Sequence, residues 1–442
     1  MSNILIAYIA ELVICIIVTA MRFKSIITIN SLYTITWFIG GMLNLIGFAG
    51  MYIASSEIHL FILTSVAVFN IGYIIYGNKN RTKLLLSELK FSVYVNPVIL
   101  INIIACMYMV PFFIKAVNIV RSSSFYELRK YAFVASDEFA TLLESRVLIW
   151  VVSPLIFSTI LIAVVLFVLG KGNKKLNAIS IINMFLYTFI LGGKLLVVLS
   201  VVLLLFMILI KKIYFSDFKW MKIQKIHIGV LMAIASYLVY TTSLRALHGL
   251  DVLENFIVYN YGGISYFDAI LKSSEYKELN SVILYGRGAF GFILTPILYF
   301  IHHAFSIPSM DGEYITKQIT ANFLPISDSY RFNSHPTALY YFWRDYNGIF
   351  GIIFGTVLLL FLFIRIEQYV FEARNVRSLT LLLFAFLVLF MTTQKYMLFE
   401  IQSFMNIFFI FFLTSDYLRY INHFLQKVIN VSNDLFKSIL NI

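Results

Sequence analysis

A short polar segment near residue 340 combines a cation, an imidazole and a carboxylate directly before a long apolar run. It contains Arg331, His335, Arg344 and Asp345. An imidazole has an ordinary pKa of about 6.5 and exchanges protons near neutral pH, while guanidinium groups bind anions through forked N–H donors. The segment predicts acid–base chemistry, with His335 as the first candidate for the base and Asp345 as the second. A hydrogen-bonded structural histidine, and an aspartate that fixes Arg344 or caps the next helix, are the alternatives.

The composition indicates where such a site would lie. Of 442 residues, 60% are hydrophobic and 13% charged, whereas a soluble domain carries about 25% charged residues. The sequence therefore predicts an all-α polytopic membrane protein. The net charge of +12 comes from cations in short loops between apolar runs, which is typical of membrane topology and not of nucleic-acid binding. Cys15 and Cys106 both lie inside apolar runs, where they act as small hydrophobic residues.

Apolar runs of about the length needed to cross a bilayer, roughly 20 residues, recur along the chain. They predict about 11 to 12 transmembrane helices. The runs cover residues 3–21, 27–51, 58–77, 94–117, 147–169, 177–192, 195–210, 227–246, 348–366, 378–394 and 398–414.

The basic loops predict the orientation. If the spans alternate, clusters of Lys and Arg that follow the first, third, fifth, seventh and 348–366 runs all fall on one side, which the positive-inside rule makes the cytoplasm. The N-terminus is then outside and the C-terminus is cytoplasmic. The apolar stretch 282–304 is interrupted by Arg287 and Pro296 and is interpreted as a re-entrant or interfacial helix.

This topology predicts four parts. Residues 1–246 form a transmembrane bundle of about eight helices, and residues 247–347 form one large extracytoplasmic loop with the candidate site. Residues 348–414 form three further transmembrane helices, and residues 415–442 form a cytoplasmic amphipathic tail.

Other charged residues fall at predicted membrane boundaries. Arg245 ends the eighth run on the external side, where it either snorkels to the headgroups or binds phosphate. Lys194 lies at the turn of a short hairpin, and Arg287 lies inside the interrupted stretch. Charges at membrane depth usually pair or line a site. Glu11 and Glu400 lie near helix ends, so interfacial exposure is the simpler interpretation for both.

Several reaction classes lack their sequence signals. Gly286-Arg287-Gly288 is too short for a dinucleotide fingerprint, and no Walker sequence occurs. His302 and His303 have no third ligand at metal spacing, so neither a metal nor a cofactor is predicted. An enzyme that works outside the cytoplasm has no nucleotide sugar available, and its donor must arrive activated in the membrane.

In two segments the sequence resembles the O-antigen and capsule polymerases (Wzy-type) and, more distantly, the O-antigen ligases. The run from Ser334 to Leu339, followed by Asp345, Gly348 and Gly351, resembles the family's histidine motif with its carboxylate and glycines. The stretch Tyr259-Asn260-Tyr261-Gly262-Gly263, with Phe267, resembles the one that opens the family's large loop. Pro336 stands where the family commonly has Asn, and Ile307-Pro308-Ser309 lacks the arginine of the family's Ile-Pro-Arg run.

The resemblance implies a metal-independent glycosyltransferase of the bacterial inner (plasma) membrane. It would join oligosaccharide repeat units carried on undecaprenyl diphosphate into O-antigen, capsule or exopolysaccharide. His335, Asp345 and Arg331 would be catalytic, and four cations would bind the diphosphate: Lys194, Arg245, Arg287 and Arg344. External aromatic residues such as Tyr259 and Trp343 would either stack on sugars or form the interfacial belt. The implied partners are lipid-linked oligosaccharides and membrane lipids, together with a flippase and a chain-length regulator.

Two alternatives remain open from the sequence. A ligase would use the same chemistry to hand the finished polymer to another lipid. A lipid-linked oligosaccharide flippase or another secondary transporter would place charges near the bilayer midplane in two related halves. Here the charges gather at one predicted face, which favours the transferase.

Overall fold

The computed structural model describes residues 2–77, 83–123, 127–129, 131, 139–217, 236–237, 252–305, 318–320, 323–328, 331–332, 335–424 and 426–427. Within these residues almost all regular structure is helical. The exception is one short antiparallel pair of strands, β1 (Leu324–Pro325) and β2 (Arg331–Phe332). The predicted all-α class is confirmed.

The chain divides into two compact units. The first comprises residues 1–82, 239–368 and 384–404, and the second comprises residues 83–238, 369–383 and 405–442. The first unit contains the helices α1 (Ser2–Phe23), α2 (Ile29–Leu45), α3 (Ser56–Tyr76), α11 (Val252–Tyr261), α12 (Gly263–Lys272), α13 (Lys277–Ser281), α14 (Gly291–Phe305) and α16 (Ala338–Tyr346).

In the part of the second unit that the structure describes, five helices predominate, with a π-helical turn (Leu148–Val152) between the second and the third. They are α4 (Val95–Ser122), α6 (Leu142–Val147), α7 (Ser153–Val168), α8 (Lys174–Ile190) and α9 (Leu195–Tyr214). The last helices contribute residues to both units: α17 (Ile349–Ala373), α18 (Val376–Met391) and α19 (Ile401–Leu413).

Six helices of the described chain are long and apolar enough to cross a membrane. They are Asn3–Phe23, Ser56–Tyr76, Val95–Ser122, Leu143–Val168, Leu195–Tyr214 and Ile349–Ala373. A seventh span results if Ile401–Leu413 and Tyr417–Phe424, which meet at 56°, are counted together. The chain is therefore a polytopic, all-α membrane protein.

The other predicted spans differ in length or cannot be compared. Helices α2 and α8 have 17 residues each and α18 has 16, so each is shorter than the roughly 20 residues of a typical transmembrane helix. Helix α14, in the stretch interpreted as re-entrant or interfacial, has 15 residues. The predicted span 227–246 lies almost entirely outside the described residues, and residues 428–442 of the predicted tail lie entirely outside them.

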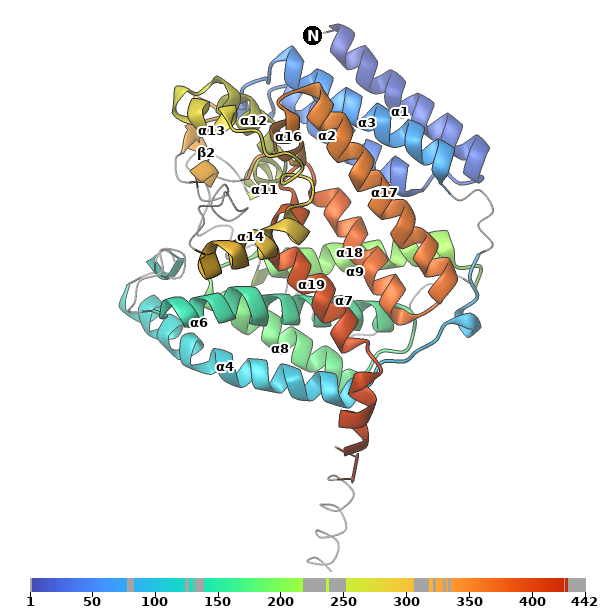
Figure 1. Ribbon diagram of the computed structural model, residues 1–442, viewed down its shortest axis with the longest axis vertical. Helices are drawn as coiled ribbons and strands as arrows, with labels where there is room; N and C mark the ends of the chain where they lie inside the picture. The colour runs from blue at the N-terminus through green and yellow to red at the C-terminus, as the bar shows by residue number, and fades with distance from the viewer. Residues whose placement is uncertain are drawn as a thin grey trace, which may run out of the picture. The chain divides into compact units, whose positions relative to one another are not determined.

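Helices α1, α2 and α3 lie side by side and contact one another (Figure 1). Their interface buries a polar network around Asn30, whose Nδ2 donates to Thr19 Oγ1 at 2.8 Å and to Asn70 Oδ1 at 3.2 Å. The Cys15 thiol also donates to Asn70 Oδ1, at 3.2 Å. In an apolar environment such interhelical hydrogen bonds hold helices together, since the unpaired groups would find no water.

The connection between α16 and α17 sets the position of α16. Asn347 adopts a left-handed conformation at φ 46°, and Gly348 follows at φ 126°, where a Cβ would be strained. The chain then turns directly into α17. A Cβ at Gly351 would collide with the Phe342 carbonyl oxygen, so this glycine allows the backbones of α16 and α17 to approach closely.

Gly351→Ala should therefore destabilise the protein by about 1–3 kcal/mol, the usual cost of forcing extra atoms into a packed contact. The measurement is thermal unfolding of the purified protein in detergent. Gly193→Ala is the matched control, because its Cβ would meet only the Thr188 carbonyl oxygen, at 3.9 Å. Equal unfolding midpoints for the two variants would contradict this account of the contact.

Candidate active site

The segment before α16 holds His335 in a defined place. Pro336 restricts His335 to an extended backbone, and Thr337 forms the N-cap of α16 with ψ 165°. The Ala338 N–H donates to the Thr392 carbonyl at 2.7 Å, which fixes this segment against the residues that follow α18. A Cβ at Gly263 would lie only 2.9 Å from the Thr393 carbonyl oxygen, so glycine allows α12 to approach the backbone that follows α18, with the His335 carbonyl oxygen in ordinary contact at 3.4 Å.

Three ionisable side chains meet at this point. The Lys395 ammonium lies 3.0 and 3.2 Å from the two carboxylate oxygens of Glu400. His335 Nε2 lies 3.9 Å from Oε1 of the same carboxylate, an oxygen that Lys395 also contacts. The side chains of His335, Glu400 and Lys395 remain 26%, 21% and 16% exposed. We call these three residues the His–Glu–Lys cluster.

The environment sets the protonation states of the cluster. Burial, together with the positive charge of Lys395, lowers the pKa of His335 to about 4, and the charge of Glu400 opposes this shift. Burial raises the pKa of Glu400, but the positive charges of Lys395 and His335 outweigh it, and the net pKa lies below the ordinary value. At neutral pH the imidazole is therefore neutral and able to accept a proton, next to an ionised carboxylate.

Two buried polar atoms flank the cluster in the chain. Thr337 Oγ1 and Gln394 Oε1 have no hydrogen-bond partner within the described part of the protein. Buried polar atoms nearly always have one. Both atoms are exceptions to this rule, and both belong to residues within two positions of a cluster member in the sequence.

Asp345 lies elsewhere and holds a turn. Its carboxylate is fully buried and accepts hydrogen bonds from the Gly288 N–H at 2.7 Å and the Ala289 N–H at 2.9 Å. Burial raises its pKa to about 6, although the backbone donors and Arg287 act in the opposite direction. These contacts join α16 to the turn that leads into α14.

Arg344 is also fully buried and binds protein groups. Its Nη1 donates to the Tyr340 hydroxyl at 2.9 Å, and its Nη2 donates to the Val282 carbonyl at 3.1 Å. A guanidinium with these partners stabilises the packing of α16 and is not exposed for a diphosphate.

The other predicted cations belong to different elements of the chain. Arg287 is half-buried and donates from Nε to the Leu284 carbonyl at 2.9 Å. Arg331 is exposed on β2. Lys194 forms the N-cap of α9 in the second unit. Arg245 lies outside the described residues, and its role as a phosphate ligand stays a prediction.

Lys395 was not among the predicted site residues, and Glu400 was predicted only to be exposed at the membrane interface. Both lie in the short connection between α18 and α19, which the predicted topology puts on the external side with His335. A lysine on that side departs from the positive-inside trend, and this was the available signal. The ion pair itself required the fold, because His335 is far from both residues in the chain.

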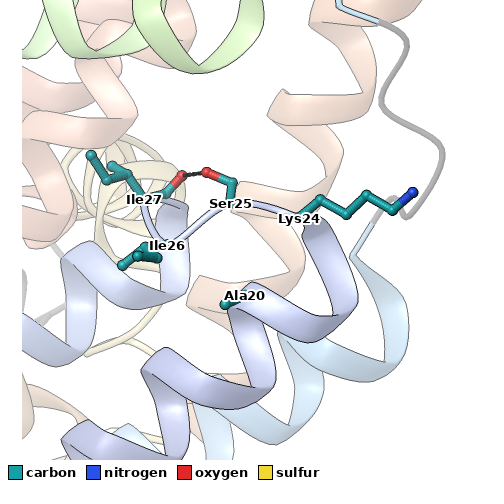
Figure 2. Close-up of a pocket in the computed structure, with 5 residues that line it drawn as sticks. All are labelled: Ala20, Lys24, Ser25, Ile26 and Ile27. Carbon is teal, nitrogen blue, oxygen red and sulfur yellow. Dashed lines mark hydrogen bonds between the residues drawn. The ribbon is translucent and has the colours of Figure 1, made fainter.

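A hollow of about 570 Å³ lies at the turn between α1 and α2, lined by Ala20, Lys24, Ser25, Ile26 and Ile27. In Figure 2 the Lys24 side chain extends away from Ile26 and Ile27, while Ser25 Oγ donates to the Ile27 carbonyl at 3.0 Å. Its lining contains neither an imidazole nor a carboxylate. The His–Glu–Lys cluster is accordingly the stronger candidate for chemistry.

Fold and site together define a polytopic, all-α membrane protein with a His–Glu–Lys cluster among its connecting segments. No family model, curated protein or solved structure matched the chain.

Proposed function

We propose that this protein is a membrane glycosyltransferase that polymerises oligosaccharide repeat units carried on undecaprenyl diphosphate, at the outer face of the bacterial plasma membrane. The observation that carries the proposal is the His–Glu–Lys cluster, in which a neutral imidazole faces a carboxylate that is paired with an ammonium. The resemblance of the segment from Ser334 to Gly351 to the repeat-unit polymerases supports the choice of reaction.

The proposed step exchanges the bond between the donor sugar and its diphosphate for a glycosidic bond to the acceptor. The acceptor hydroxyl gives its proton to His335, and its oxygen forms a bond to the anomeric carbon of the donor sugar. The bond from that carbon to the diphosphate oxygen breaks, and undecaprenyl diphosphate leaves with the bonding electron pair. Since Nε2 faces Glu400, Nδ1 is the nitrogen that we expect to take the proton.

Glu400 and Lys395 have complementary parts in this step. The carboxylate stabilises the imidazolium that forms, and the ammonium stabilises the charge that develops on the leaving diphosphate. A bound diphosphate also raises the pKa of His335 from about 4 toward the working pH, because a nearby anion favours the protonated imidazole. Substrate binding would thereby convert a weak base into an effective one.

The direct test compares lipid-linked saccharides in cells with and without the protein. A polymerase deletion should accumulate single lipid-linked repeat units. Long polymer that is not transferred to its final lipid would instead identify a ligase. Loss of lipid-linked repeat units from the outer face would identify a flippase.

The decrease of kcat/KM toward acidic pH, the acid limb of its pH profile, should depend on the charge at residue 395. A base acts only when deprotonated, so kcat/KM of the wild type should rise with pH through a value of about 4. Lys395 lowers the pKa of His335, and Lys395→Met should therefore move this limb to higher pH. The measurement is the initial rate of chain extension by membranes across a pH series.

Two further variants control this experiment. Lys395→Arg keeps the positive charge and should keep the position of the limb. Glu400→Gln removes a charge that raises the pKa of His335, so its limb should move to lower pH. A limb that stays in place in Lys395→Met would exclude His335 as the titrating base.

A further inference from the structure

A second site in the first unit is a cleft of about 630 Å³. Its walls come from the start of α3, the end of α12, the turn before α13, α13 itself and α16. The side chains that matter most are Glu57, Lys272, Lys277, Ser273, Asn280 and Trp343. One large aromatic side chain is thus surrounded by charged, amide and hydroxyl groups.

Trp343 supplies the apolar surface of the cleft. Its side chain is half-buried on α16, and its ring lies nearly parallel to that of Tyr340, at 17° with 6.4 Å between the centroids. A flat, fixed aromatic ring binds other apolar faces at low entropic cost. The C–H face of a pyranose ring has this shape and polarity.

Two hydrogen bonds hold the Asn280 side chain in place. Its Nδ2 donates to the Ile270 carbonyl at 3.1 Å, and its Oδ1 accepts from the Tyr340 hydroxyl at 2.9 Å. That hydroxyl in turn accepts from the buried Arg344. Such a chain of hydrogen bonds preorganises the wall of the cleft beneath Trp343.

The charges of the cleft have both signs. Lys272 is paired with Asp268 at 2.5 Å, Lys277 is exposed, and Glu57 lies in the first turn of α3. A site for a polyanion would carry a marked excess of cations. Neighbouring donors and acceptors of both signs suit sugar hydroxyls, which donate and accept hydrogen bonds at once.

We infer that this cleft binds pyranose residues of the oligosaccharide, with Trp343 as the stacking surface. The inference rests on the proposed function and adds a saccharide-binding site to it. Trp343 belongs to α16, the helix that directly follows the segment with His335. One helix would thus connect the glycan-binding cleft to the His–Glu–Lys cluster.

The test is glycan binding by the full-length protein, labelled and reconstituted in nanodiscs, on an array of neutral, amino and acidic pyranose oligosaccharides. The wild type should bind at least one class, and Trp343→Ala should lower that signal about tenfold, as truncation of a central aromatic contact does. Trp343→Phe should be intermediate. Trp150→Ala, in the second unit, should bind as the wild type does.

Ser274→Trp provides a second variant that leaves the tryptophan intact. Ser274 is exposed and lines the cleft, so a bulky side chain there should fill the cleft and abolish binding. Absence of any bound glycan on the array would overturn the inference, as would undiminished binding by both Trp343→Ala and Ser274→Trp. Because the array involves no transfer step, its result is independent of whether the His–Glu–Lys cluster makes polymer.

Discussion

Polymer should disappear from cells in which His335→Ala replaces the wild-type protein, and the amount of protein in the membrane should stay the same. A positioned acid–base group contributes about 100-fold or more to a rate. His335 lies on an extended segment, retains 26% exposure, and is not a core residue, so truncation should leave the fold intact. The measurement is a gel of lipid-linked saccharides, together with immunodetection of the protein in membranes.

The matched control is His423→Ala. His423 is exposed in the helical stretch Tyr417–Phe424 and should tolerate substitution with full polymer. Full-length polysaccharide from His335→Ala would remove the imidazole from the reaction and with it the observation that carries the proposed function.

Asp345→Ala should have the second large effect, and it should act on stability. The carboxylate accepts two backbone hydrogen bonds in a fully buried position, and its removal leaves the Gly288 and Ala289 N–H groups without an acceptor. Hydrogen bonds to charged groups contribute roughly 1.5–3 kcal/mol each, so the total loss from two such bonds should reach about 3–6 kcal/mol. The expected results are a lower thermal midpoint in detergent and less protein in the membrane.

Two variants separate this role from catalysis. Asp345→Asn keeps one acceptor oxygen and should be intermediate, whereas Asp416→Ala changes an exposed carboxylate and should have little effect. A stable Asp345→Ala protein that makes no polymer would show that the carboxylate takes part in the reaction, contrary to this account.

The helical fold was largely predictable from the sequence. Long runs of Leu, Ile, Val and Phe have no soluble alternative, and within a bilayer only helices satisfy their own backbone hydrogen bonds without neighbours. The lengths of the individual helices were less predictable. The run 27–51 gave a helix of 17 residues, because its later part turns through Gly47, Ala49 and Gly50, which have positive φ values.

The site was predictable only in part. His335 was predicted as a site residue because Arg344 and Asp345 are near it in the sequence. Both of those side chains are fully buried, and Asp345 accepts from backbone N–H groups while Arg344 donates to the Tyr340 hydroxyl. The partners that the structure gives to His335 are Glu400 and Lys395, from the connection that follows α16, α17 and α18. Proximity in sequence was therefore a poor guide to proximity in space.

The sequence by itself determined that the chain is helical and resides in a membrane, because both properties follow from local hydrophobicity summed along each run. Tertiary structure alone decided which charged groups meet. Whether a carboxylate becomes a backbone acceptor, as Asp345 does, or the partner of an imidazole and an ammonium, as Glu400 does, depends on the groups that folding brings within a few ångströms of it. Electrostatic and hydrogen-bonding energies change steeply over that distance, and a linear sequence does not contain it.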